Sequence, residues 1–105
     1  MSVIVSDSNF ASAVLASAKP VLVDFWTDWC GPCKPLGVML DELAQEIGDR
    51  VVIAKINAET SPEVTQRFGV RGFPTMLIFK DGQVAAMRSG TMPKGKLREW
   101  IEASI

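Results

Sequence analysis

Residues 24–34 read Asp-Phe-Trp-Thr-Asp-Trp-Cys-Gly-Pro-Cys-Lys, and this stretch places Cys30 and Cys33 directly after an apolar run. They are the only cysteines among 105 residues, and the sequence contains no histidine. Cysteines at this spacing lie on one side of a helical turn, where their sulfurs can close a small disulfide ring. The pair therefore indicates reversible dithiol chemistry.

Two structural uses of the cysteine pair compete with a redox role. A permanent disulfide is disfavoured, because loop-closure stabilisation grows with the number of residues enclosed and this ring encloses only Gly31 and Pro32. A structural zinc site needs four ligands, usually Cys or His, and its remaining ligands here would have to be carboxylates or come from a second subunit. The redox interpretation is favoured, and no metal is expected.

The composition is that of one small globular domain, with 48% apolar residues and a formal net charge of −1. Because 11 Lys and Arg are matched by 12 Asp and Glu along the chain, the basic face of a nucleic-acid-binding protein is not expected. The amino end has no signal-peptide pattern, and the apolar stretches are too short to span a membrane. We therefore expect a cytoplasmic protein, where a lone Cys-x-x-Cys is catalytic or redox-sensing.

Apolar residues alternate between strand and helix periods along the chain, which predicts an α/β sandwich around a mixed sheet. The predicted strands are residues 3–5, 21–26, 51–56, 75–79 and 83–88. The predicted helices are residues 9–18, a long helix from the cysteines to Gly48, a short helix from Pro62 and a last helix from about Pro93.

Cap and turn residues support these boundaries. Ser6, Asp7 or Ser8 is expected to cap the first helix, and Ser61 is expected to cap the short third helix. The dipeptide Asp81-Gly82 predicts a two-residue hairpin turn, so the last two strands should pair antiparallel.

Three further motifs follow the cysteine segment in order: Phe73-Pro74-Thr75, Phe79-Lys80-Asp81-Gly82 and Gly90. With residues 24–34 they resemble the thioredoxin family, and the resemblance covers nearly all the chain. It implies a single thioredoxin domain over residues 1–105, with a central five-stranded mixed β-sheet flanked by four helices. The element order that the residues predict is the same.

The residues around the cysteines predict a division of roles. Cys30 stands where a strand ends and a helix begins, and the positive end of the helix favours its thiolate, so Cys30 is the expected nucleophile. Cys33 is the expected resolving thiol, which closes the disulfide and releases the reduced target. Asp24 and Lys55 each interrupt an apolar strand. Either they are strand-end charges that reach solvent, or Asp24 is a buried acid with a raised pKa.

The resemblance selects the second alternative for this acid. It implies that Asp24 lies behind the cysteines and transfers a proton for Cys33, with Lys55 nearby to tune it. Without the resemblance, Trp29 is as well explained as a half-buried core aromatic.

The resemblance also implies a groove for target proteins beside the cysteines. Gly31, Pro32 and Pro74 support the active site, and the bond before Pro74 is expected to be cis, which lets the Phe73 backbone pair with an extended target segment. The expected substrate-binding residues are mostly apolar or small: Trp29, Val70, Gly72, Phe73, Pro74, Gly90 and Thr91. Such a shallow groove suits many protein disulfides.

The chain departs from the family pattern at two positions. Thioredoxins commonly carry a proline five residues after the second cysteine, where this chain has Val38, and Pro35 stands closer to the cysteines instead. A proline in the first helical turn is tolerated because those N–H groups lack partners within the helix. We expect a helix without a sharp kink near Val38.

The resemblance implies a general protein-disulfide reductase that maintains cell redox homeostasis. Gly31-Pro32 between the cysteines, with no histidine, points to a reductant and away from an oxidase. No bound cofactor is expected, since electrons would come from NADPH through an FAD-containing thioredoxin reductase, although a ferredoxin-linked reductase could serve the same dithiol. The expected partners are this reductase and disulfide-containing proteins such as reductases and peroxidases. The chain itself is expected to be a monomer. The alternative is a non-catalytic binding module that uses the same groove.

Overall fold

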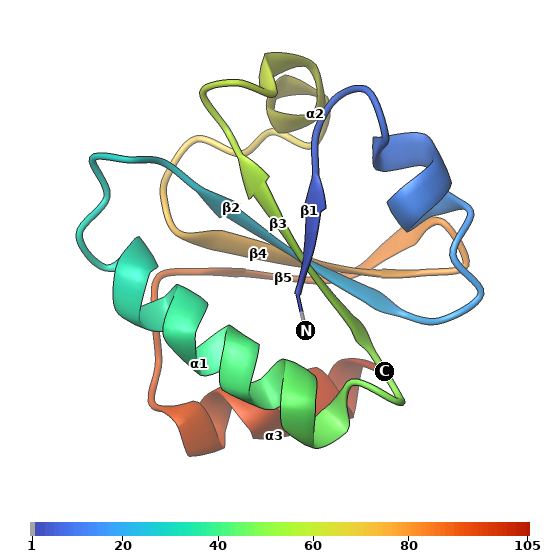
Figure 1. The fold of residues 1–105 in the computed structure, drawn as a ribbon, viewed down its shortest axis with the longest axis vertical. Coiled ribbons are helices and arrows are strands. Elements are labelled where there is room, and N and C mark those ends of the chain that lie inside the picture. The colour runs from blue at the N-terminus through green and yellow to red at the C-terminus, as the bar shows by residue number, and fades with distance from the viewer. Residues whose placement is uncertain (1) are drawn as a thin grey trace.

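The computed structural model describes residues 2–105, which form a five-stranded mixed sheet with four helices (Figure 1). The strands are β1 (Val3–Val5), β2 (Val21–Trp26), β3 (Val52–Asn57), β4 (Thr75–Lys80) and β5 (Gln83–Ser89). The helices are η1 (Ala11–Leu15), α1 (Cys33–Ile47), α2 (Pro62–Arg67) and α3 (Lys94–Ser104). This is the predicted fold class.

The strand order is β1-β3-β2-β4-β5, so β2 lies at the centre of the sheet. β1, β3 and β2 run parallel, and β4 pairs antiparallel with both β2 and β5. The predicted hairpin is confirmed: Asp81 and Gly82 both have positive φ, at 52° and 76°, as a tight turn between antiparallel strands requires.

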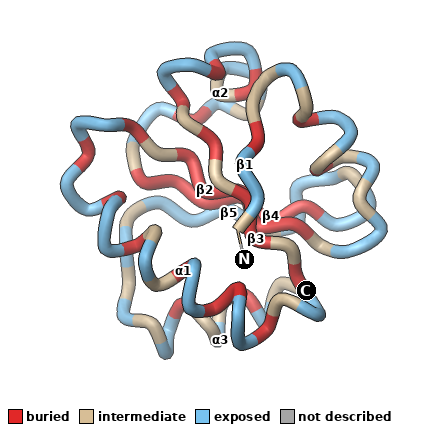
Figure 2. Tube along the Cα trace, in the orientation of Figure 1, coloured by how far each residue is buried: buried red, intermediate tan, exposed pale blue. Residues whose placement is uncertain are grey.

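Two apolar layers cover the two faces of the sheet. α1 and α3 pack on one face, where Leu22 and Ile53 of the sheet meet Leu40 of α1 and Leu97 of α3. η1 and α2 lie on the other face, against the side chains that point away from α1 (Figure 1). Burial is greatest along the central strands, while the edge strand β5 is largely exposed (Figure 2). Among residues 2–105, no helix has the length and apolar character needed to cross a membrane.

The first helix is shorter than predicted. The sequence predicts a helix over residues 9–18, but η1 is a π-helical turn in which the Ala16 N–H donates to the Ala11 carbonyl at 2.9 Å. Polar side chains compete for the backbone here: Asn9 Oδ1 accepts from the Ser6 N–H at 2.7 Å, and the Ser12 hydroxyl donates to the Asn9 carbonyl at 3.1 Å. The predicted cap by Ser6, Asp7 or Ser8 was wrong, since no side chain caps η1.

Asp7 instead caps α2, which is distant in sequence. Its carboxylate accepts hydrogen bonds from the N–H groups of Glu63 and Val64, at 3.1 and 2.9 Å. Ser61 occupies the N-cap position, but its hydroxyl makes no capping bond and is buried without a hydrogen-bond partner among the described residues. The prediction that Ser61 caps this helix was therefore wrong, and a carboxylate at the positive helix end takes its place.

We predict that Asp7→Ala lowers the free energy of unfolding by about 1–2 kcal/mol, because two N–H groups of α2 lose their acceptor. Urea denaturation measures this change, and amide hydrogen exchange should accelerate at Glu63 and Val64. Ser61→Ala is the matched control and should cost nothing, because it removes a buried hydroxyl without a partner. Equal losses in the two variants would contradict the assignment of the cap to Asp7.

Candidate active site

The two cysteines lie where the central strand passes into the longest helix. β2 ends at Trp26, α1 begins at Cys33, and Cys30 lies in the turn between them. Cys30 and Cys33 form a disulfide with a Cα–Cα distance of 5.4 Å, and each residue is 5% exposed. The structure therefore holds the oxidised state of the pair.

α1 is one continuous helix from Cys33 to Ile47 (Figure 1), and Val38 lies within it. Pro35 stands in its first turn, where a missing N–H costs little. Two neighbouring N–H groups donate hydrogen bonds to carbonyls of the active-site loop: the Cys33 N–H to the Cys30 carbonyl and the Lys34 N–H to the Gly31 carbonyl, both at 3.3 Å. The loop is thus held to the start of the helix.

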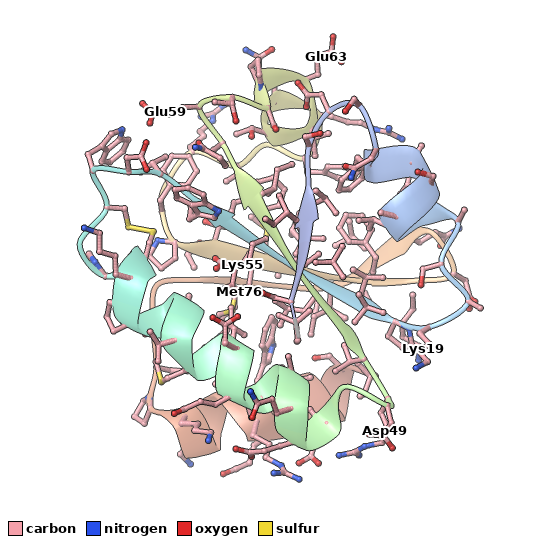
Figure 3. All side chains as sticks on the ribbon, viewed as in Figure 1. Lys19, Asp49, Lys55, Glu59, Glu63 and Met76 are labelled. Atoms are coloured by element: carbon pink, nitrogen blue, oxygen red, sulfur yellow. A yellow bond between two sulfur atoms is a disulfide. The ribbon has the colours of Figure 1, made fainter. Side chains whose placement is uncertain are left out.

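Asp24 lies beneath this helix and is 1% exposed. It is aligned with Lys55 on β3 and with Met76 on β4, on the face of the sheet that α1 covers. Figure 3 labels Lys55 and Met76. Oδ1 of Asp24 has no hydrogen-bond partner among residues 2–105. Burial raises the pKa of Asp24 to about 7, while the Lys55 charge lowers it and the Asp41 charge raises it. The alternative of a strand-end charge in solvent is excluded for Asp24.

Lys55 does not bind Asp24 directly. Its Nζ lies 2.9 Å from Oδ1 of Asp41 and donates to the Gly37 carbonyl at 3.2 Å, so both contacts are with α1. Asp41 was missed by sequence reasoning, because a carboxylate on the polar side of a helix is indistinguishable from any solvated charge. No signal in the sequence connects it to the cysteines.

A cavity of about 490 Å³ connects these groups, between the start of α1 and the neighbouring strands. Its lining includes Asp24, Cys33, Gly37, Asp41 and Lys55. Cys33 and the buried acid therefore open on the same space. Among residues 2–105, there is no group of three or more side chains that could hold a metal ion.

Trp29 directly precedes Cys30 in the sequence and lies on the surface. It is 68% exposed, so it is not a core aromatic. Its ring meets Phe73 edge to face, with 5.8 Å between centroids, and its Nε1–H donates to Glu59 at 3.1 Å. These contacts bring the segment around Phe73 to the active-site loop, and Glu59 was not predicted from the sequence.

The bond between Phe73 and Pro74 is cis, as expected from the resemblance. The Gly90 N–H donates to the Pro74 carbonyl at 2.9 Å, with Gly90 at a φ of 82° that favours glycine. Gly31, Pro32, Gly72 and Thr91 are all exposed. Val70 differs, because its side chain is 6% exposed and packs in the core beneath η1 and α2.

Comparison with known proteins identifies the family. The family model described as Thioredoxin matches residues 1–103. The thioredoxin of Rhodospirillum rubrum is 52% identical over 101 residues, which cover 96% of this chain and 97% of that protein. The thioredoxin of Acidithiobacillus ferridurans is 43% identical, covering 96% of this chain and 94% of its own. The chain belongs to the thioredoxin family, and its Cys30–Cys33 pair fits a protein-disulfide reductase.

Proposed function

We propose that the chain reduces protein disulfides in two exchange steps. The Cys30 thiolate attacks a target disulfide, forms a mixed disulfide and expels one target thiolate. The Cys33 thiolate then attacks the Cys30 sulfur, expels the second target thiolate and forms the Cys30–Cys33 disulfide. The target gains two electrons and this chain loses two. The observation that carries the proposal is the disulfide at the start of α1, above a buried acid.

The two cysteines differ in surroundings, which supports their different roles. Cys30 precedes α1, where the positive helix end favours a thiolate. Cys33 is the first residue of α1 and lines the cavity that Asp24 also lines. A buried thiol stays protonated unless a base removes its proton. With a pKa near 7, Asp24 can accept the Cys33 proton at neutral pH and release it through the cavity.

Target proteins would bind beside Trp29 and Phe73. The exposed backbone around Gly72 and the cis bond before Pro74 support strand addition by an extended target segment. The other small or apolar residues of this groove would be Gly31, Pro32, Gly90 and Thr91. Val70 would support the groove from the core, because its side chain is buried.

The electron source would be an FAD-containing thioredoxin reductase that uses NADPH, and the chain would act as a cytoplasmic monomer. A reducing compartment keeps a Cys-x-x-Cys pair cycling and does not leave it as a permanent disulfide. Targets would be enzymes with catalytic or regulatory disulfides, such as reductases and peroxidases. A non-catalytic binding module is not favoured, since the thioredoxin family model matches residues 1–103, which include the disulfide-forming pair.

The order of attack is tested by single cysteine variants. We predict that Cys33→Ser accumulates a stable mixed disulfide with a disulfide-containing target, because the second attack is lost. Cys30→Ser should trap none, because the nucleophile is absent. Non-reducing electrophoresis and intact-mass measurement of the 1:1 adduct distinguish the two. Trapping through Cys33 in the Cys30→Ser variant would reverse the assigned roles.

The direction of electron flow is tested by the redox potential of the pair. We expect a value below the glutathione pool of about −220 to −260 mV, close to the established reference value for thioredoxin of about −270 mV. Tryptophan fluorescence in defined dithiothreitol buffers measures it. A potential near about −120 mV, typical of a periplasmic oxidase, would contradict a reductant.

Asp24→Asn tests the proton transfer. We predict that collapse of the mixed disulfide slows by roughly tenfold or more at pH 7, because Cys33 loses its base. Stopped-flow release of a labelled target thiol measures the rate between pH 6 and pH 9. Wild-type rates throughout this range would remove Asp24 from the mechanism.

The same variant should change the pH dependence of stability. Asp24 titrates near 3.8 when unfolded and near 7 when folded, so the folded chain holds more protons between these values. The free energy of unfolding therefore falls as pH rises through this window, by about 4 kcal/mol in all. Asp24→Asn should abolish this fall in urea denaturation, whereas the exposed Asp49→Asn should retain it.

A further inference from the structure

Lys55 lines the same cavity as Asp24. The two residues are register partners on the parallel strands β2 and β3, so their side chains leave the same face of the sheet. Both line the cavity, and the Lys55 side chain is 21% exposed while Asp24 is buried. An ammonium in this position could pair with the Asp24 carboxylate and hold it ionised.

Asp41, and not Asp24, forms the ion pair with the Lys55 ammonium. Its Oδ1 lies 2.9 Å from Lys55 Nζ and also accepts a hydrogen bond from the Ser2 hydroxyl at 2.8 Å. Gly37, one helical turn earlier on α1, accepts from the same Nζ through its carbonyl at 3.2 Å. An ammonium has three N–H donors, so α1 takes two of them. Within residues 2–105, no ion pair joins Lys55 to Asp24.

Two other charged side chains line the cavity, and among residues 2–105 neither forms an ion pair with Asp24 or Lys55. Asp28 in the loop after β2 and Lys34 on α1 line the same cavity, and Cys33 is bound in the disulfide. β1 contributes the apolar Ile4 and Val5, and β4 places the neutral Met76 beside Asp24. Lys55 is thus the cation in register with Asp24, and Asp41 is the anion that holds it.

We propose that Asp41 is a positioning residue for the Cys33 step: with the Gly37 carbonyl, it holds the Lys55 ammonium against α1 and away from the Asp24 carboxyl. Asp24 then remains free to accept a proton from Cys33. This inference rests on the proposed role of Asp24 as the base. Asp41 itself is half exposed, so the Lys55–Asp41 pair adds little to stability and its effect is on the charge near Asp24.

The test removes Asp41 and follows Asp24 directly. In Asp41→Ala, Lys55 loses its partner and one negative charge disappears, so the titration midpoint of Asp24 should fall from about 7 to roughly 6. Carbon-13 NMR of the Asp24 carboxyl in the oxidised protein measures the midpoint without any activity assay. Glu42→Ala is the matched control, because Glu42 is the neighbouring carboxylate on α1 and pairs with Lys94. Glu42→Ala should leave the Asp24 midpoint unchanged. Asp41→Glu should keep the Asp24 midpoint close to its wild-type value.

The Lys55→Met background separates two explanations of the shift: that Asp41 positions Lys55, and that the Asp41 charge only repels the Asp24 carboxylate. In Lys55→Met, which has no ammonium to release, Asp41→Ala should lower the Asp24 midpoint by much less than in the wild-type background. Equal shifts in the two backgrounds, or no shift in Asp41→Ala itself, would overturn the proposal. Circular dichroism confirms that each variant is folded.

The pH dependence of mixed-disulfide collapse then tests whether a change in the Asp24 midpoint alters the Cys33 step. The pH profile of collapse should move to lower pH in Asp41→Ala together with the NMR midpoint. If the midpoint moves and the profile does not, Asp41 positions Lys55 as proposed but Asp24 is not the base for Cys33. If neither moves, the positioning role itself fails, whatever the role of Asp24.

Discussion

The pairing of β2 with β3 on one edge and with β4 on the other is the interaction on which the rest of the structure depends. It places β2 at the centre of the sheet, where residues 21–25 are all buried. The strand then delivers the cysteine loop to the start of α1 and holds Asp24 below it. A charged residue in such a strand is unfavourable for stability, and burial therefore raises the pKa of Asp24.

The active site combines two faces with different tasks. On the surface, the Trp29–Phe73 contact and the cis bond before Pro74 form a rim around the disulfide loop. Beneath it, the cavity between α1 and the parallel strands joins Cys33 to Asp24. In the proposed mechanism, a target protein approaches the surface face while protons move through the cavity. The separation lets one shallow surface serve many targets without changing the proton chemistry.

Charge around Asp24 is arranged by α1 as well as by the sheet. Lys55 is aligned with Asp24 but contacts Asp41 and the Gly37 carbonyl. The helix that begins with Cys33 therefore also binds the lysine that is aligned with the buried acid. Cys33 and the Lys55 ammonium are thus both held by α1, so their positions relative to the sheet are set together.

Local signals in the sequence determined the dithiol, the element order and the hairpin at Asp81-Gly82, because spacing and periodicity act over a few residues. They left Asp24 either buried or at a solvated strand end, and the structure shows that it is buried. Only the tertiary structure decided that Asp7 caps α2 in place of Ser61, that η1 is a short π-helical turn, and that Asp41 holds Lys55. Asp7 and Glu63 are 56 residues apart, and no local pattern marks such a pair. Packing of the two layers on the sheet brings these polar groups together, and competition among nearby acceptors then selects the partner.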